Sequence, residues 1–175
     1  QLQNYKKIIL SSDKDFFQLL DNKTVLYRPV QKEVLNRKSI LDKFDIHPTN
    51  FAMARAMVGD KSDNIEGIQG VGLKTVSRRF PFLKEEKTKT FEDILTHCKK
   101  ELAGSEIKAY RNILESESIL KRNYQMMQLY APILSIDSKN LINDTLKDPD
   151  QSFNKTELIK MMVKDGFGEI NFIEL

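Results

Sequence analysis

Hydrophobic positions near the start of the chain predict a small set of strands around one short helix. Residues 7–12 (KIILSS) form an apolar run that ends in small hydroxyl residues, which predicts a buried strand leading into a loop. Residues 16–20 carry apolar side chains at helical spacing, and residues 24–27 (TVLY) predict a second strand that stops before Pro29. A third strand is expected within residues 32–35. This order predicts a parallel strand pair joined by a right-handed crossover.

Helical spacing replaces strand spacing from about residue 39 onward. Helices are predicted over residues 39–44 and 51–58, and Gly59 is placed to end the second of them. Further helices are predicted at 74–80, 91–99, 107–114, 118–129 and 155–164, with a turn-rich stretch over 137–150. We therefore expect an α/β region over residues 1–46, followed by an all-α region over residues 47–175.

Composition limits the class of protein without naming a function. The chain has 175 residues, of which 40% are hydrophobic and 30% charged, and no apolar run is long enough to cross a membrane. The single cysteine, Cys98, excludes an internal disulfide and suits a reducing compartment. No signal-peptide pattern is visible in residues 1–7, so a cytoplasmic location is expected.

Charge is unevenly distributed along the chain. The net charge is only +3. Residues 67–100 hold eight Lys or Arg against four acids, whereas residues 42–66 hold five acids against three bases. An acidic region followed by a basic helical region suits an enzyme that binds phosphates broadly and works with metal ions at one of them.

Two loops carry spaced aspartates. Asp13 and Asp15 follow the first predicted strand, and Asp60 and Asp63 follow the helix over 51–58. Carboxylate oxygens are the ligands that Mg²⁺ prefers, and two such loops could converge on a two-ion centre for phosphodiester cleavage. The structural alternative is that Asp13 caps the following helix, Asp15 occupies its first turn, and the second pair shapes a turn.

Residues 65–76 (IEGIQGVGLKTV) combine three closely spaced glycines with the start of a helix. Glycine allows close approach of a phosphate to the backbone, and Lys74 adds a cation in the first helical turn. The spacing is not that of a P-loop. A hairpin that grips a nucleic-acid backbone and a hairpin that serves packing alone are both compatible with the pattern.

Three motifs in order resemble the 5′ nuclease family. They are IILSSDKDF at 8–16, VGDKSDN at 58–64 and IQGVGLKT at 68–75. The family includes flap endonucleases, bacteriophage 5′–3′ exonucleases, phage-type ribonucleases H and the 5′ nuclease domain of DNA polymerase I. The matched motifs span roughly residues 5–80.

The resemblance implies a partial PIN-like α/β sheet followed by a helix-three-turn-helix DNA-binding region, with a helix-hairpin-helix near residues 58–80. In that family the acids hold two Mg²⁺ or Mn²⁺ ions, which generate hydroxide and stabilise the charge at the scissile phosphate. Glycine-hairpin carbonyls hold a monovalent cation such as K⁺. The resemblance gives catalytic and metal-binding roles to Asp13, Asp15, Asp60 and Asp63, and DNA contacts to Gly67, Gly70, Val71, Gly72, Lys74, Thr75 and Arg78.

The resemblance also implies elements that this sequence does not show. In the family an amino-terminal strand, an arch and further acids precede the matched region, so we expect the chain to correspond to the carboxyl-terminal part of a 5′ nuclease. The missing amino-terminal part would belong to the same or a separate chain. The expected function is a metal-dependent 5′–3′ exonuclease and 5′-flap endonuclease in DNA replication and repair. Expected substrates are duplex DNA with a 5′ flap, nick or free 5′ end, and RNA primers. The alternatives are a non-catalytic DNA-binding module and a PIN-type ribonuclease, the latter disfavoured by the glycine hairpin.

Overall fold

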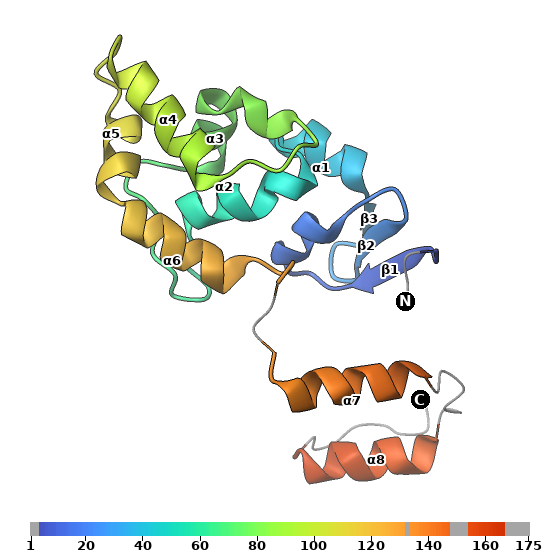
Figure 1. The fold of residues 1–175 in the computed structure, drawn as a ribbon. Helices are drawn as coiled ribbons and strands as arrows, with labels where there is room; N and C mark the ends of the chain where they lie inside the picture. Colours follow the sequence, from blue (N-terminus) through green and yellow to red (C-terminus); the bar gives the residue numbers. More distant parts are fainter. Residues whose placement is uncertain (1–3, 132–133, 148–153, 167–175) are drawn as a thin grey trace. The chain divides into compact units, whose positions relative to one another are not determined.

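The structure, a computed structural model, describes residues 4–131, 134–147 and 154–166 (Figure 1). The chain divides into two compact units, Gln1–Pro132 and Ile133–Leu175. The predicted boundary at residue 46 falls inside the first unit and stays a prediction. No helix in the described ranges combines the length and apolar character needed to cross a membrane.

A small mixed sheet opens the first unit. Its strands are β1 (Lys7–Leu10), β2 (Thr24–Arg28) and β3 (Glu33–Leu35), in the order β1-β2-β3. β1 pairs with β2 in parallel and β2 pairs with β3 antiparallel, so the predicted strands and the parallel pair are confirmed. The connection between β1 and β2 contains a 3₁₀ helix, η1 (Asp15–Leu19). The carboxyl end of β1 therefore leads directly into the first pair of aspartates.

The two faces of the sheet differ in burial. Because residues two apart in a strand share a face, Ile9, Leu26 and Leu35 point to the core, and Leu26 is fully buried. On the opposite face Ile8 and Leu10 are 72% and 69% exposed. This outer sheet face, which also carries exposed Val34, is therefore apolar and open to solvent within the described residues.

Six helices and two 3₁₀ helices complete the first unit. They are α1 (Arg37–Phe44), η2 (Pro48–Asn50), α2 (Phe51–Val58), α3 (Leu73–Arg79), η3 (Pro81–Lys84), α4 (Phe91–Leu102), α5 (Lys108–Glu115) and α6 (Glu117–Met127). The predicted helices of this unit are all present: α2 has the predicted bounds, and the ends of the others differ by at most three residues. Capping boxes formed by Asn36 with Ser39 and by Thr90 with Asp93 explain where α1 and α4 begin.

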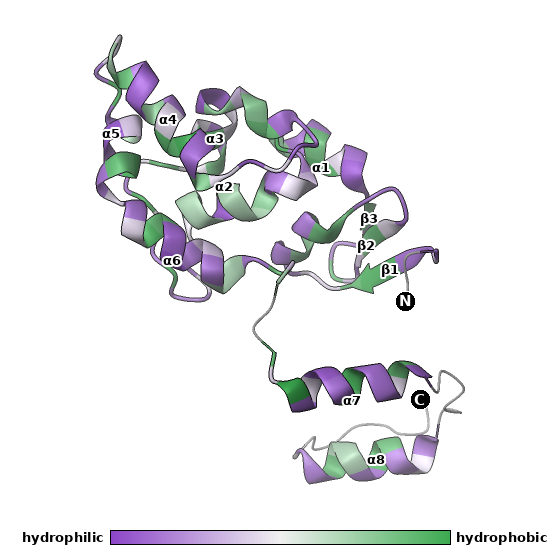
Figure 2. Ribbon diagram, viewed as in Figure 1, coloured by the Kyte–Doolittle hydropathy of each residue, from purple (hydrophilic) through white to green (hydrophobic). Residues whose placement is uncertain are grey.

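Helix α2 is the centre of this unit. Every residue from Phe51 to Met57 is buried, and Figure 2 shows the helix as largely hydrophobic. It packs against α6, α3, η1 and η2, so it contacts both the sheet side and the helical side of the unit. Apart from Arg55 the helix is apolar on all sides, and such a helix is stable only when other elements surround it, as they do here.

The second unit contains α7 (Ile136–Lys147) and α8 (Lys155–Lys164). Helix α8 was predicted, but the turn-rich stretch expected over 137–150 is wrong for residues 137–147, and residues 148–150 lie outside the described part. The Asp and Asn residues there are exposed on a helix, where turn-forming side chains are tolerated. Neither helix has a buried residue.

Candidate metal and nucleic-acid site

The first aspartate pair forms a local turn at the end of β1. The carboxylate Oδ1 of Asp13 accepts a hydrogen bond from the backbone N–H of Asp15 at 2.8 Å. Asp13 is exposed, and Asp15 is the first residue of η1. Asp15 thus lies in the first turn of η1, as the structural alternative expected, and none of the described residues forms a hydrogen bond or ion pair with the second oxygen of Asp13.

The second pair lies on a tight loop that closes on itself. Asp60 and Ile65 exchange two backbone hydrogen bonds of 2.8 Å, with Asn64 in the left-handed region at φ 56°. Asp60 Oδ1 also accepts from the backbone N–H and the hydroxyl of Ser62. Asp63 is exposed, and none of the described residues forms a hydrogen bond or ion pair with its side chain. The loop thus fixes Asp60 and leaves Asp63 apart.

Arg55 joins the two aspartate loops. Its Nε lies 3.0 Å from Asp15 Oδ1, its terminal nitrogen Nη2 pairs with Asp60 Oδ2, and Nη1 donates to the carbonyl of Gly59 at 3.2 Å. Only 6% of Arg55 is exposed. A buried charge requires partners of this kind, so the ion pairs hold together two loops that are 45 residues apart in sequence.

The pKa values of the two acids that Arg55 contacts are shifted in opposite directions. Burial raises the pKa of Asp15 more than the hydrogen bond and charge of Arg55 lower it. Hydrogen bonding from Ser62 and then the contact with Arg55 lower the pKa of Asp60 to about 2, against a smaller effect of burial. Burial disfavours the charged form of Arg55, but the hydrogen bonds to the carboxylates of Asp60 and Asp15 outweigh this effect. The pKa of Arg55 is therefore raised. Asp60 and Arg55 therefore form a firmly ionised pair.

The buried side chain of Gln18 connects the first aspartate loop to the end of α6. Its amide nitrogen donates to the carbonyls of Asp15 at 2.8 Å and Met127 at 3.0 Å, and its oxygen accepts from the N–H of Leu129 at 2.8 Å. The hydroxyl of Tyr130 donates to the carbonyl of Gln18. Both the nitrogen and the oxygen of this buried side-chain amide therefore have partners, in η1 and at or just after the end of α6.

These acids form an incomplete metal site in the present arrangement. Among the described residues there is no group of three or more His, Cys, Asp or Glu side chains placed to hold a metal ion. Both oxygens of Asp60 are occupied by Ser62 and Arg55, and Asp63 does not join the others. Mg²⁺ requires near-octahedral oxygen ligation, so this donor set does not fit a two-ion centre.

The glycine hairpin packs directly against the second aspartate loop. A Cβ on Gly67 would lie 1.9 Å from the Val58 carbonyl oxygen, and one on Gly59 would lie 2.4 Å from the Gly67 nitrogen. Gly59 and Gly70 also have left-handed φ values of 74° and 76°. Glycines 59 and 67 are therefore required for packing, as the structural alternative for the hairpin expected.

The later part of the hairpin is open to solvent. A Cβ on Gly72 would meet no atom within 4 Å, and Lys74 and Arg78 are exposed on α3 without an ion pair among the described residues. Val71 is buried, and its N–H donates to the carbonyl of Ile68, so its side chain belongs to the core. The open glycine and the two free cations are the groups that a phosphate backbone could reach.

Two asparagines hold the hairpin in place. Asn112 donates to the carbonyl of Gln69 at 2.8 Å. Asn123, which is fully buried on α6, donates to the carbonyls of Ala56 at 3.1 Å and Glu66 at 2.8 Å. Thr75 is half-buried on α3. The hairpin is therefore a fixed element rather than an adaptable loop.

Sequence reasoning missed Arg55 and Gln18. A lone arginine inside the otherwise apolar helix FAMARAMV, four residues before Gly59, was the available signal for Arg55. The partners of Gln18 are 109 and 111 residues away along the chain, so no local pattern indicates them.

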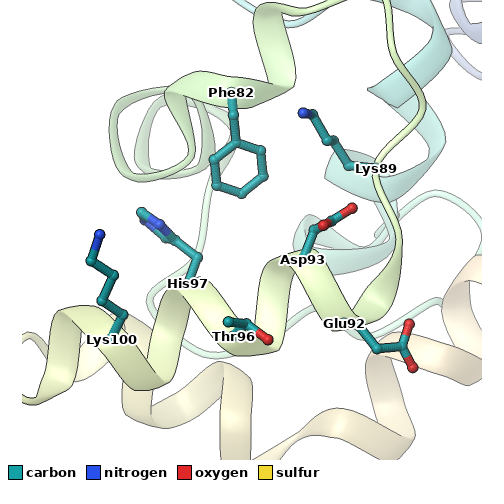
Figure 3. A pocket seen from close by; sticks show the side chains of 7 residues that line it. All are labelled: Phe82, Lys89, Glu92, Asp93, Thr96, His97 and Lys100. Carbon is teal, nitrogen blue, oxygen red and sulfur yellow. The ribbon is translucent and has the colours of Figure 1, made fainter.

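A separate hollow of about 350 Å³ lies between η3 and α4 (Figure 3). Its walls include the rings of Phe82 and His97, whose centroids are 5.1 Å apart. Two of its charged groups are engaged in structural bonds: Lys89 pairs with Glu85, and Asp93 belongs to the capping box of α4. His97, predicted as a structural or surface residue, bonds the carbonyl of Arg79. This hollow shares no residue with the aspartate loops.

Comparison with known proteins finds relatives that are named 5′-3′ exonuclease and DNA polymerase I. No family model matches. The 5′-3′ exonuclease of Aquifex aeolicus is 29% identical over 172 residues, which cover 98% of this chain and 54% of that protein. Thermostable DNA polymerase I of Thermus filiformis is 40% identical over 70 residues, which cover 40% of this chain and 8% of the polymerase.

Solved structures of bacteriophage T5 nucleases have a fold similar to that of this chain. The bacteriophage T5 flap endonuclease, solved with DNA and metal ions, has a TM-score of 0.55 and 22% identity over 69% of this chain and 42% of that chain. A zinc-bound T5 5′-exonuclease gives a TM-score of 0.54 over the same shares. The chain thus spans about half the length of the curated exonuclease it matches. The resemblance suggested by its three motifs is confirmed: the chain is a relative of the 5′ nucleases.

Proposed function

We propose that the chain acts as part of a structure-specific 5′–3′ exonuclease and 5′-flap endonuclease. The observation that carries this proposal is the arrangement around the carboxyl end of α2. Arg55 brings Asp15 and Asp60 together there, and the close contact of Gly59 with Gly67 attaches the glycine hairpin to the same point. Acids that could act on a phosphodiester and an element that could bind the nucleic-acid backbone then belong to one compact unit.

We place DNA binding on α2, the hairpin and α3 as a helix-three-turn-helix. Support comes from the open Gly72 and from the exposed cations Lys74 and Arg78, which form no ion pair with any described residue, with Thr75 beside them. A K⁺ ion at the hairpin carbonyls belongs to the same proposal. The carbonyls of Ile68 and Gln69 already accept hydrogen bonds, so such an ion would use the remaining ones.

We propose Mg²⁺ or Mn²⁺ as the metal, with Asp13, Asp15, Asp60 and Asp63 as this chain's contribution to its ligands. The incomplete donor set requires further carboxylates, which we assign to the amino-terminal part of a 5′ nuclease in the same or a separate polypeptide. The apolar outer sheet face supports this, because a second body of protein would bury it. The edge of β1 away from β2 also has no partner strand among the described residues.

The proposed substrates are duplex DNA with a 5′ flap, a nick or a free 5′ end, and RNA primers, in the cytoplasm. Backbone amides, lysine and arginine contact phosphates without reading bases, so selection would follow the shape of the substrate. The Aquifex relative named a 5′-3′ exonuclease supports this substrate class.

A cleavage assay tests the proposal. A labelled 5′-flap duplex is incubated with Mg²⁺ or Mn²⁺ and the chain, with and without an amino-terminal nuclease fragment. We expect binding by the chain alone and cutting when the fragment is added, and we expect Asp60→Asn to abolish the cutting. Unchanged cutting by Asp60→Asn would refute the site assignment.

A second candidate is a non-catalytic DNA-binding module. The observation that favours it is the occupation of both Asp60 oxygens by Ser62 and Arg55. Under this alternative the chain binds flap DNA and never cuts it, whatever fragment or metal is supplied.

A further inference from the structure

A hollow of about 480 Å³ lies between the end of α1 and the beginning of α3. The residues that line it are Lys43, Phe44 and Asp45 on the side of α1, and Leu73, Lys74 and Ser77 on α3. We propose that this hollow binds one phosphate of a nucleic-acid backbone between Lys43 and Lys74. The inference rests on the proposed contact of α3 with DNA, and it adds α1 to that surface.

The wall of the hollow that carries Lys43 is fixed by the core. The centroid of the Phe44 ring lies 5.8 Å from that of Phe17 and 5.4 Å from that of Phe51, and both of these partners are buried. The ammonium of Lys43 lies 5.8 Å from the centroid of the Phe44 ring, within the range of a cation–π contact. Phe44 is therefore an anchored wall that keeps a cation beside the hollow.

The hollow has an excess of positive charge. Lys43 and Lys74 are both exposed, and neither forms an ion pair with any described residue. Asp45, the acid that lines the hollow, already pairs with Lys84 at 2.9 Å. Two lysines without acidic partners favour an anion, and the several oxygens of a phosphate allow both ammonium groups to bind it at once.

Ser77 supplies a hydroxyl donor to the same hollow. Its hydroxyl donates to the carbonyl of Lys74 at 3.4 Å, which is longer than the roughly 2.5–3.0 Å usual for a hydroxyl donor. Such a bond is weak, so little is lost when the hydroxyl turns to a phosphate oxygen instead. The hollow therefore offers two cations and one neutral donor.

The hollow continues the surface that we assign to DNA. Lys74 and Arg78 are four residues apart, so they lie on the same side of α3. Lys43 reaches the same hollow as Lys74 from a different helix, so a backbone that passes Arg78 and Lys74 would meet Lys43 next. A polymer with regularly repeated phosphates matches such a series of cations better than a free phosphate ion does.

A structural role for Lys43 makes a different prediction. Lys43 lies in the last turn of α1, where a cation stabilises the helix through its dipole. If that is its whole role, removal of the charge lowers stability slightly and has no specific effect on DNA binding. If Lys43 contacts a phosphate, removal of the charge also lowers the salt dependence of DNA binding. The salt dependence therefore separates the two roles.

The experiment measures binding of the full 175-residue chain to a labelled 5′-flap duplex by fluorescence anisotropy. Salt is varied from about 50 to 200 mM, and EDTA is present so that no divalent ion contributes. The variants are Lys43→Gln, Lys43→Arg and Lys74→Gln, with circular dichroism to confirm folding. The matched control is Lys38→Gln, which removes the same charge from an exposed position of the same helix outside the hollow.

One phosphate contact contributes about 0.9 to the slope of log K against log salt concentration. We expect Lys43→Gln to lower this slope by about that amount and to weaken binding about fivefold at the lowest salt. Lys43→Arg and Lys38→Gln should stay close to the wild type. Equal slopes in Lys43→Gln and Lys38→Gln would overturn the inference, and a reduced slope in Lys74→Gln would then leave the proposed contact of α3 intact. Absence of binding by the wild type would overturn both.

Discussion

Gly67 and Gly72 lie five residues apart in the same hairpin and have opposite surroundings. Gly67 is in close contact with the backbone of Val58, whereas a Cβ added to Gly72 would have no neighbour within 4 Å. The two positions therefore separate the packing role of the hairpin from its proposed contact with DNA.

Substitution of each glycine by alanine tests that separation. Gly67→Ala should lower the free energy of unfolding by about 3 kcal/mol, because the new methyl group meets backbone that cannot move away. Gly72→Ala should stay within about 1 kcal/mol of wild type, since its φ of −105° suits any residue. Urea denaturation measures both.

Gly72→Ala should nevertheless weaken binding to a 5′-flap duplex severalfold in fluorescence anisotropy, because the methyl group keeps a phosphate from the backbone. Gly104→Ala, at another open glycine outside the hairpin, is the matched control and should bind like wild type. Unchanged binding by Gly72→Ala would contradict close approach of the DNA at this position.

Cys98 gives a pH-dependent prediction at the residue scale. Burial raises the pKa of this thiol to about 12, from a usual value near 8.5 in an unfolded chain. The stabilisation by the protonated thiol is complete below about pH 8.5 and is lost as the pH rises toward 12. Stability should fall by about 2 kcal/mol more between pH 8 and pH 10 in the wild type than in Cys98→Ala.

Urea denaturation of both proteins at the two pH values measures this difference. Because lysines and tyrosines also titrate in this range, only the difference between the proteins reports on Cys98. Equal slopes in the two proteins would show that the thiol is not buried.

At the scale of elements, α6 is the part that connects the sheet side to the hairpin. Asn123 bonds α2 and the hairpin, and the residues just after α6 bond Gln18. Asn123→Leu should destabilise the protein by about 1–3 kcal/mol, because it leaves the buried carbonyl of Ala56 and the part-buried carbonyl of Glu66 without this donor. Gln125→Leu, at an exposed position of the same helix, is the control and should have little effect in thermal denaturation.

The sequence predicted most elements because their signals are local. Apolar runs indicated the strands, helical spacing indicated the helices, and Gly59 ended α2 as expected. Helix α7 was missed because its polar residues are typical of turns and its apolar face is not buried. The aspartate loops were found from their motifs, but the role of Arg55 was not, because it depends on loops that only the folded chain brings together.

For the whole molecule, the burial pattern predicts which part folds alone. The buried hydrophobic residues of the described chain all lie between Phe17 and Met127, inside the first unit. A chain ending at residue 132 should therefore keep the melting temperature of the full chain within a few degrees. Circular dichroism melting of both chains checks this, and loss of cooperative melting in the shorter chain would contradict it.

The hydrogen bonds of Gln18 have a consequence for the order of folding. They join residues that are 109 and 111 positions apart, so their formation closes a very long loop of chain. We expect them to form after the more local contacts. During synthesis, Gln18 has no partner in α6 until 109 further residues have been made. The loop that carries Asp13 and Asp15 is thus completed late, when the first unit is otherwise assembled, and a nascent chain cannot present a finished acidic site before then.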